Sequence, residues 1–155
     1  RWNTGNKIIA ARMISWVIYS GAQRMSKAIK LIDGGMKERK AFHMAGLPYE
    51  DAVRLNRLGI HRGNVDLILD QFRIHGRDID GKTLTDKTES LVHPNFSDWD
   101  NPGLIEVMTA TVNAEVDNII VTPNALSKPL LHNDPRFGLP MRLFNQFSNF
   151  GMAQG

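Results

Sequence analysis

Residues 7–33 constrain the fold more than any other stretch, because apolar side chains recur along them at helical spacing. On a helix, six of these side chains fall on one stripe: Ile14, Ile18, Ala22, Met25, Ile29 and Ile32. The side chains roughly opposite are polar: Arg12, Ser15, Tyr19, Gln23, Ser26 and Lys30. This pattern predicts a long amphipathic helix that buries its apolar stripe against other parts of the protein.

The charges of this first segment all have one sign. Every ionised side chain from Lys7 to Lys30 is a cation, and the first acidic residue is Asp33. The formal net charge of the whole chain is only +3, so the basic character is local. We expect the basic face to contact a polyanion, either nucleic acid or lipid head groups, through Arg12, Arg24, Lys27, Lys30, Lys37, Arg39 and Lys40. The alternative is a bundle helix whose lysines only face water.

Composition excludes several classes of protein. The 155 residues include no cysteine, so the chain has neither disulfides nor thiolate metal sites. The apolar run at residues 13–22 is shorter than the roughly 20 residues that a membrane-spanning helix needs. No secretory signal pattern is visible. Because the sequence begins with Arg1 and stops within an apolar helical pattern, we expect it to be a piece of a larger protein.

Glycines divide the next part of the chain into short helices. Residues 36–45, 48–58 and 65–75 have helical patterns that end at Gly46, Gly59 and Gly76. Each of these helices is too short to be stable without neighbours, so we expect them to pack with the first helix as one unit over residues 1–76. Residues 77–101 have no sustained periodicity, and we expect a connector loop and a subdomain boundary there.

The remaining residues, 102–155, predict two further helices. The first covers residues 102–121, with an acidic solvent side and Pro102 in its first turn. Four prolines between residues 122 and 140 favour an extended strap. A second helix follows Pro140 and is strongly apolar. The sequence therefore predicts an all-α fold: one long amphipathic helix, a packet of short helices, a long loop, and two helices joined by a proline-rich strap.

No motif for catalysis or metal binding is present. Asp78, Asp80, Asp86 and Glu89 have a spacing similar to a calcium-binding loop, but Lys82 occupies a ligand position. The sequence has no paired histidine motif, no nucleophile elbow and no phosphate-binding loop. We therefore expect no catalytic, cofactor-binding or metal-binding residue and no cofactor in this part of the protein. Whether the full-length chain is an enzyme stays open.

The apolar stripes of the first and last helices are candidates for assembly contacts. We expect these contacts at Ile14, Ile18, Met25, Ile29, Phe144, Phe147 and Phe150. The phenylalanine stripe has two other possible environments, which are the interior of the protein and a membrane interface.

The end of the chain resembles a family of phage proteins. The residues that carry the resemblance are Trp99-Asp100, a helix ending in Ile120-Val121-Thr122-Pro123, a strap with Pro129 and Asp134-Pro135, and Leu143-Phe144-Asn145-Gln146-Phe147. This order is similar to the C-terminal region of the very large internal virion proteins, also called core or ejection proteins, of short-tailed podophages. The resemblance covers residues 99–150.

The resemblance implies a protein that is stored inside the capsid and acts in the host cell envelope after ejection. There it would assemble with copies of itself and with sister ejection proteins into a channel that carries viral DNA into the host. Viral DNA and the host membrane surface are the implied polyanionic partners. Some such proteins carry a peptidoglycan transglycosylase domain near the N-terminus, but residues 1–155 contain no match to its catalytic motif. The alternatives are a basic helical nucleic-acid-binding module and a non-catalytic part of a larger phage enzyme packaged in the virion.

Overall fold

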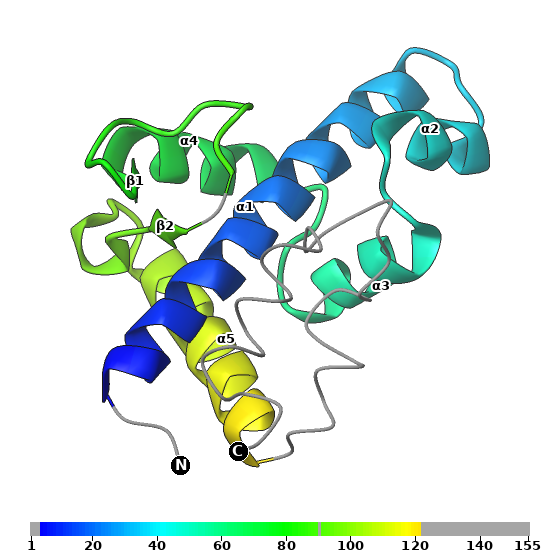
Figure 1. Cartoon of the computed structure of the whole chain (residues 1–155). Helices are drawn as coiled ribbons and strands as arrows, with labels where there is room; N and C mark the ends of the chain where they lie inside the picture. Colours follow the sequence, from blue (N-terminus) through cyan, green and yellow to red (C-terminus); the bar gives the residue numbers. More distant parts are fainter. Residues whose placement is uncertain (1–3, 90, 122–155) are drawn as a thin grey trace.

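The computed structural model describes residues 4–89 and 91–121, and these fold mainly into helices (Figure 1). The elements follow one another as α1 (Thr4–Asp33), α2 (Glu38–Ala45), α3 (Tyr49–Arg57), α4 (Val65–His75), β1 (Arg77–Asp78), β2 (Val92–His93), the 3-10 helix η1 (Phe96–Asp98) and α5 (Pro102–Val121). This confirms the predicted all-α fold class. The strap and the last helix, predicted for residues 122–155, lie outside the described residues.

Helix α1 is the centre of the structure. It contacts α2, α3, α4, α5 and β2. Figure 1 shows it running diagonally through the molecule, with α4 on one side and α2 and α3 on the other. Every residue from 13 to 22 is buried, which is more than two turns of helix without a solvent-exposed side. An ordinary surface helix buries only one stripe, so α1 is a core helix.

The polar face predicted for α1 is therefore buried over much of its length, which corrects the expectation from the sequence, and of its six side chains Lys30 is the exposed one. Ser15, Tyr19 and Ser26 are all buried. Each side chain makes a hydrogen bond: the Ser15 hydroxyl donates to the carbonyl of Ala11, Tyr19 to that of Thr85, and Ser26 to the Asp66 carboxylate. Because these hydroxyls are paired, the helix buries its polar side without the cost of unsatisfied polar groups.

Glycines end the first two helices, and the sequence predicts the second of these ends, at Gly46. Gly35 and Gly46 have the left-handed values φ +102° and φ +72°, which side chains rarely adopt. After α1, the Met36 amide donates to the carbonyl of Leu31, and after α2 the Leu47 amide donates to that of Phe42. These bonds use carbonyl groups that the helix would leave unpaired, so each glycine both stops a helix and turns the chain.

Residues 77–101, expected as a connector between two helical parts, instead cover the core. They contain the antiparallel contact of β1 with β2, where Arg77 faces His93, and a single bridge between Arg77 and Thr83. Leu84, Val92 and Trp99 are buried in the same hydrophobic cluster as α1 and α5. The segment lacks helical periodicity because single buried side chains, rather than a repeating face, attach it to the helices.

An aromatic cluster joins this covering segment to the helices. Phe72 of α4 lies with its ring centroid 5.3 Å from Tyr19 and 5.1 Å from Trp99, and Trp99 lies 5.0 Å from Phe96. The pairs are tilted or edge-to-face, which is the favoured arrangement for aromatic rings. The Trp99 indole also donates a hydrogen bond to the carbonyl of Pro94. The hydrophobic core thus continues from α1 across residues 77–101 to α5 without a break.

Two asparagines precede helices, and they act differently. The Asn101 carboxamide oxygen accepts from the amide of Leu104, so Asn101 caps α5. The Asn64 side chain makes no capping bond to α4. It accepts from the amide of His61 and donates to the carbonyl of Gly59. Asn64 therefore stabilises the turn before α4 rather than the first turn of the helix.

Candidate functional site

The residues expected as assembly contacts on α1 lie inside the chain. Ile14, Ile18 and Met25 are no more than 5% exposed, and Ile29 packs against the same core. Their apolar surface is covered by the other helices of this chain, so none of the first three is available to a second protein. Phe144, Phe147 and Phe150 lie outside the described residues.

Two of the seven expected polyanion contacts are partly buried. The Arg24 guanidinium donates a 3.0 Å hydrogen bond to the carbonyl of Gly46, and the buried carboxylate of Asp51 lies close to it. Burial lowers the pKa of Arg24, and the attraction of Asp51 opposes that change. Arg12 is half-buried and lies close enough to His93 to lower the pKa of its imidazole, although burial is the larger cause. Arg24 thus connects α1 to the start of α3, and Arg12 lies beside β2.

The other five expected contacts are exposed, but the structure divides them between two places. Lys27 and Lys30 line a shallow depression between α1 and α4. Lys37, Arg39 and Lys40 lie at the start of α2, and Arg39 lines a different pocket. Lys27 and Lys30 therefore line one pocket with residues of α4, whereas Arg39 lines another with residues of α2 and α3.

The depression between α1 and α4 has a mixed charge. Its volume is about 440 Å³. The cations are Lys27, Lys30 and Arg73, and two carboxylates lie among them, those of Asp66 and Asp70. The Asp66 carboxylate is already used, because it accepts the hydrogen bond of Ser26. A phosphate bound here would meet three positive side chains but also the repulsion of at least one nearby acid.

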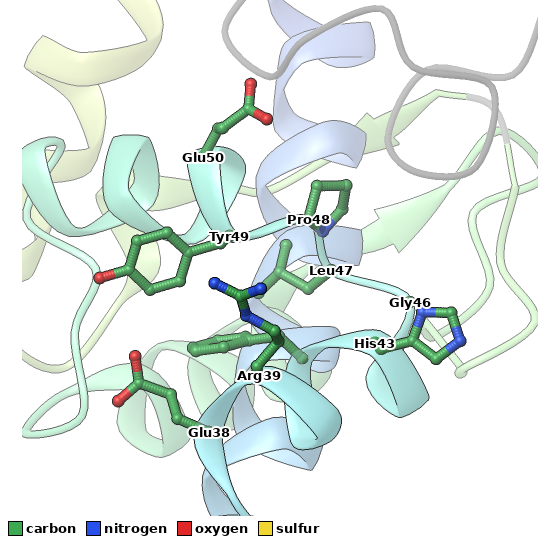
Figure 2. Close-up of a pocket in the computed structure, with 9 residues that line it drawn as sticks. Glu38, Arg39, His43, Gly46, Leu47, Pro48, Tyr49 and Glu50 are labelled. Carbon is green, nitrogen blue, oxygen red and sulfur yellow. The ribbon is translucent and has the colours of Figure 1, made fainter.

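A larger groove, of about 760 Å³, lies between α2 and α3 (Figure 2). It forms because the left-handed Gly46 ends α2 and Pro48, with φ −54°, begins α3 after a single intervening residue. That residue, Leu47, is 1% exposed and anchors the link in the core. Arg24 holds the carbonyl of Gly46 from the α1 side. The shape of the groove is therefore set by buried groups beneath it.

The groove presents aromatic side chains at the surface. Tyr49 is 60% exposed, and its ring meets that of Phe42 edge to face with the centroids 5.8 Å apart. Leu47 and Pro48 supply the rest of the apolar lining. An exposed tyrosine beside a partly buried phenylalanine is typical of a protein interface, where aromatic side chains act as anchors.

Charged side chains surround this apolar centre. Figure 2 shows Glu38 and Glu50 at opposite ends of the groove with Tyr49 between them, and Arg39 extending into the middle. His43 lies on the side away from Tyr49. The groove therefore offers two acceptors at its ends and two nitrogen donors within it. Such a site suits a segment of protein that has an apolar anchor and polar neighbours.

Sequence reasoning did not find this groove. The signal was present in the stretch from Gly46 to Tyr49, where a turn, a proline and a tyrosine follow one another. By itself this stretch predicts only the start of a helix. Whether Tyr49 is covered or exposed depends on where α2 packs, and a one-dimensional pattern does not contain that information.

Residues 4–89 and 91–121 contain no cluster of three or more histidine or acidic side chains that could hold a metal ion. In the same part of the chain, no helix combines the length and the hydrophobicity that a bilayer crossing requires.

Comparison with protein-family models, with curated proteins and with solved structures gives no match to this chain.

Proposed function

We propose that this chain is a structural assembly segment of a phage internal virion protein, and that the groove between α2 and α3 is one of its contacts with a partner chain. The observation that carries the assembly role is the exposed aromatic centre of the groove, where Tyr49 is 60% exposed above Phe42. A monomer gains nothing from leaving this surface in water. A partner that covers it gains only part of the roughly 1.5–3 kcal/mol that full burial of a large apolar side chain contributes, because Tyr49 is 60% exposed.

The phage context of this proposal comes from the resemblance of residues 99–150. In that context the segment would be stored in the capsid and would then help to form the channel for viral DNA in the host envelope. The partners would be other copies of the chain and the sister ejection proteins. The role is structural, with no catalytic residue assigned in this segment.

Sedimentation velocity tests the assembly role. The chain should associate as its concentration rises, and Tyr49→Ala should weaken that association by about ten-fold or more, as expected for the loss of an interface anchor. Ile79→Ala is the matched control. Ile79 is 68% exposed and belongs to the segment after β1, which Figure 1 places on the other side of α1. A chain that stays monomeric at every concentration, or that loses association equally in both variants, would contradict the proposal.

Nucleic-acid binding is the second candidate function. The observation in its favour is that Lys27, Lys30 and Arg73 line one depression. If they bind phosphates, DNA affinity should fall steeply with salt, and Lys27→Gln with Lys30→Gln should reduce the log–log salt slope by up to about 2. Lys87→Gln, which removes an exposed cation from the covering segment, is the control. An unchanged slope in the double variant would exclude this site.

A further inference from the structure

The composition of the groove limits the chemistry of its occupant. The apolar centre at Phe42 and Tyr49 requires an aromatic or large aliphatic anchor. The carboxylates of Glu38 and Glu50 at the two ends favour a cation on the partner, and acids there would be repelled. Arg39 adds a positive charge in the middle of the groove, and with His43 it supplies donors for acceptors such as side-chain amides. The groove thus fits a segment with an aromatic anchor, side-chain amides and a basic residue that can reach one of the two ends.

One segment of this chain has this chemistry. Residues 141–150 read Met-Arg-Leu-Phe-Asn-Gln-Phe-Ser-Asn-Phe, with phenylalanine at every third position from Phe144 to Phe150. The charged residue among them is Arg142, and no acidic residue follows Asp134. Asn145, Gln146 and Asn149 carry the amides. The segment lies outside the described residues, and its composition matches each requirement of the groove.

We propose that residues 141–150 of a second copy of this chain bind in the groove between α2 and α3. A phenylalanine would lie against Phe42 and Tyr49, and Arg142 would pair with Glu38 or Glu50. This inference rests on the assembly role proposed above and names the partner surface for it. Because the groove and the segment are different surfaces, the contact is head-to-tail, and repeated contacts of this kind form rings or open filaments.

Site-specific cross-linking tests the contact, and the absence of native cysteine makes every introduced thiol unique. The 155-residue chain carrying His43→Cys is mixed with the same chain carrying Gln146→Cys and treated with a short bis-maleimide. The matched control replaces the first variant with Asp80→Cys, an exposed position after β1. We expect at least ten-fold more cross-linked dimer from the first mixture than from the control. Equal yields from both would overturn the proposal.

A charge swap distinguishes the specific contact from nonspecific association of the two chains. Arg142→Glu should reduce the cross-link at least five-fold, and combining it with Glu38→Lys and Glu50→Lys in the groove chain should restore most of the yield. A yield that does not respond to either change would overturn the charge pairing on which the inference rests. A chain that carries both cysteines and cross-links within itself at high dilution, without forming dimers, would overturn the assignment to a second copy.

The outcomes separate this inference from the assembly role itself. If association depends on Tyr49 but the 43–146 cross-link does not form above the control, the groove binds another partner and this inference fails while the assembly role stands. If the chain does not associate at any concentration, both fail.

Discussion

Replacing Tyr19 by phenylalanine tests whether the polar face of α1 is buried. The Tyr19 side chain is 0% exposed. Its hydroxyl donates to the carbonyl of Thr85 at 3.1 Å and accepts a longer bond, 3.4 Å, from the amide of Gln23. Tyr19→Phe keeps the ring and its contact with Phe72 but removes both hydrogen bonds. The substitution therefore isolates the polar interaction between α1 and the covering segment.

The expected decrease in the free energy of unfolding follows from the Thr85 carbonyl, which loses its hydrogen-bond donor. A carbonyl that loses its donor in a partly buried position costs about 1–3 kcal/mol, and we take about 1.5 kcal/mol because the Thr85 carbonyl keeps some access to water. For a domain of this size, an m-value of about 2 kcal/mol/M in urea converts this into a midpoint lower by about 0.7 M. The slope itself should not change, because the surface exposed on unfolding is the same.

The second tyrosine of the chain is the control, since the sequence contains only two. Tyr49 is 60% exposed, so Tyr49→Phe removes a hydroxyl that faces water, and its cost should stay within about 0.5 kcal/mol. Urea unfolding followed by circular dichroism measures both variants. If Tyr19→Phe shifts the midpoint no more than Tyr49→Phe does, the polar face of α1 is not buried beneath residues 83–89 and the description of α1 as a core helix is refuted.

Two further predictions concern two glycines and a partly buried acid, Glu115. A Cβ at Gly76 would lie 2.4 Å from the Phe72 carbonyl oxygen, whereas at Gly46 the nearest atom is 3.9 Å away and only φ +72° is unfavourable. Gly76→Ala should therefore cost about 3 kcal/mol or more and Gly46→Ala about 1–2 kcal/mol in urea unfolding, and the reverse ranking would contradict the packing. Burial raises the pKa of Glu115, although Arg54 opposes it, so the folded state holds that proton more tightly than the unfolded state. The resulting stability is present at low pH and is lost as the pH rises through the raised pKa. Glu115→Gln should therefore raise the Tm at pH 7, by an amount that shrinks as the pH falls toward the ordinary pKa of a glutamate; a difference independent of pH would contradict this.

The sequence by itself determined the local structure of the described residues. The ends of α1 and α2 follow from Gly35 and Gly46. Glycine readily adopts the left-handed conformation that ends a helix, and this preference does not depend on distant parts of the chain. The start of α5 follows from Asn101 and Pro102 for a similar reason. The all-α class follows from helical periodicity, which depends on residues three or four positions apart.

Only the tertiary structure decided what each helix face contacts. Tyr19 and Trp16 of α1 reach acceptors 66 and 72 residues away in the chain, the carbonyls of Thr85 and Thr88. Periodicity identifies the residues that share a face, but it does not say whether water, another helix or an irregular segment covers that face. For this reason the polar residues of α1 were predicted to face outward, and residues 77–101 were predicted to be a connector.

Periodicity also does not predict the groove between α2 and α3, for the same reason. Arg24 was expected on a polyanion-binding face because its charge and spacing match those of its basic neighbours. In the folded chain it binds the Gly46 carbonyl beneath the groove, and the exposed aromatic surface lies above it at Tyr49. Local sequence determines helices and turns because their hydrogen bonds are short-range. The groove depends on how α1, α2 and α3 pack together, and that packing is set by contacts between residues far apart in the chain.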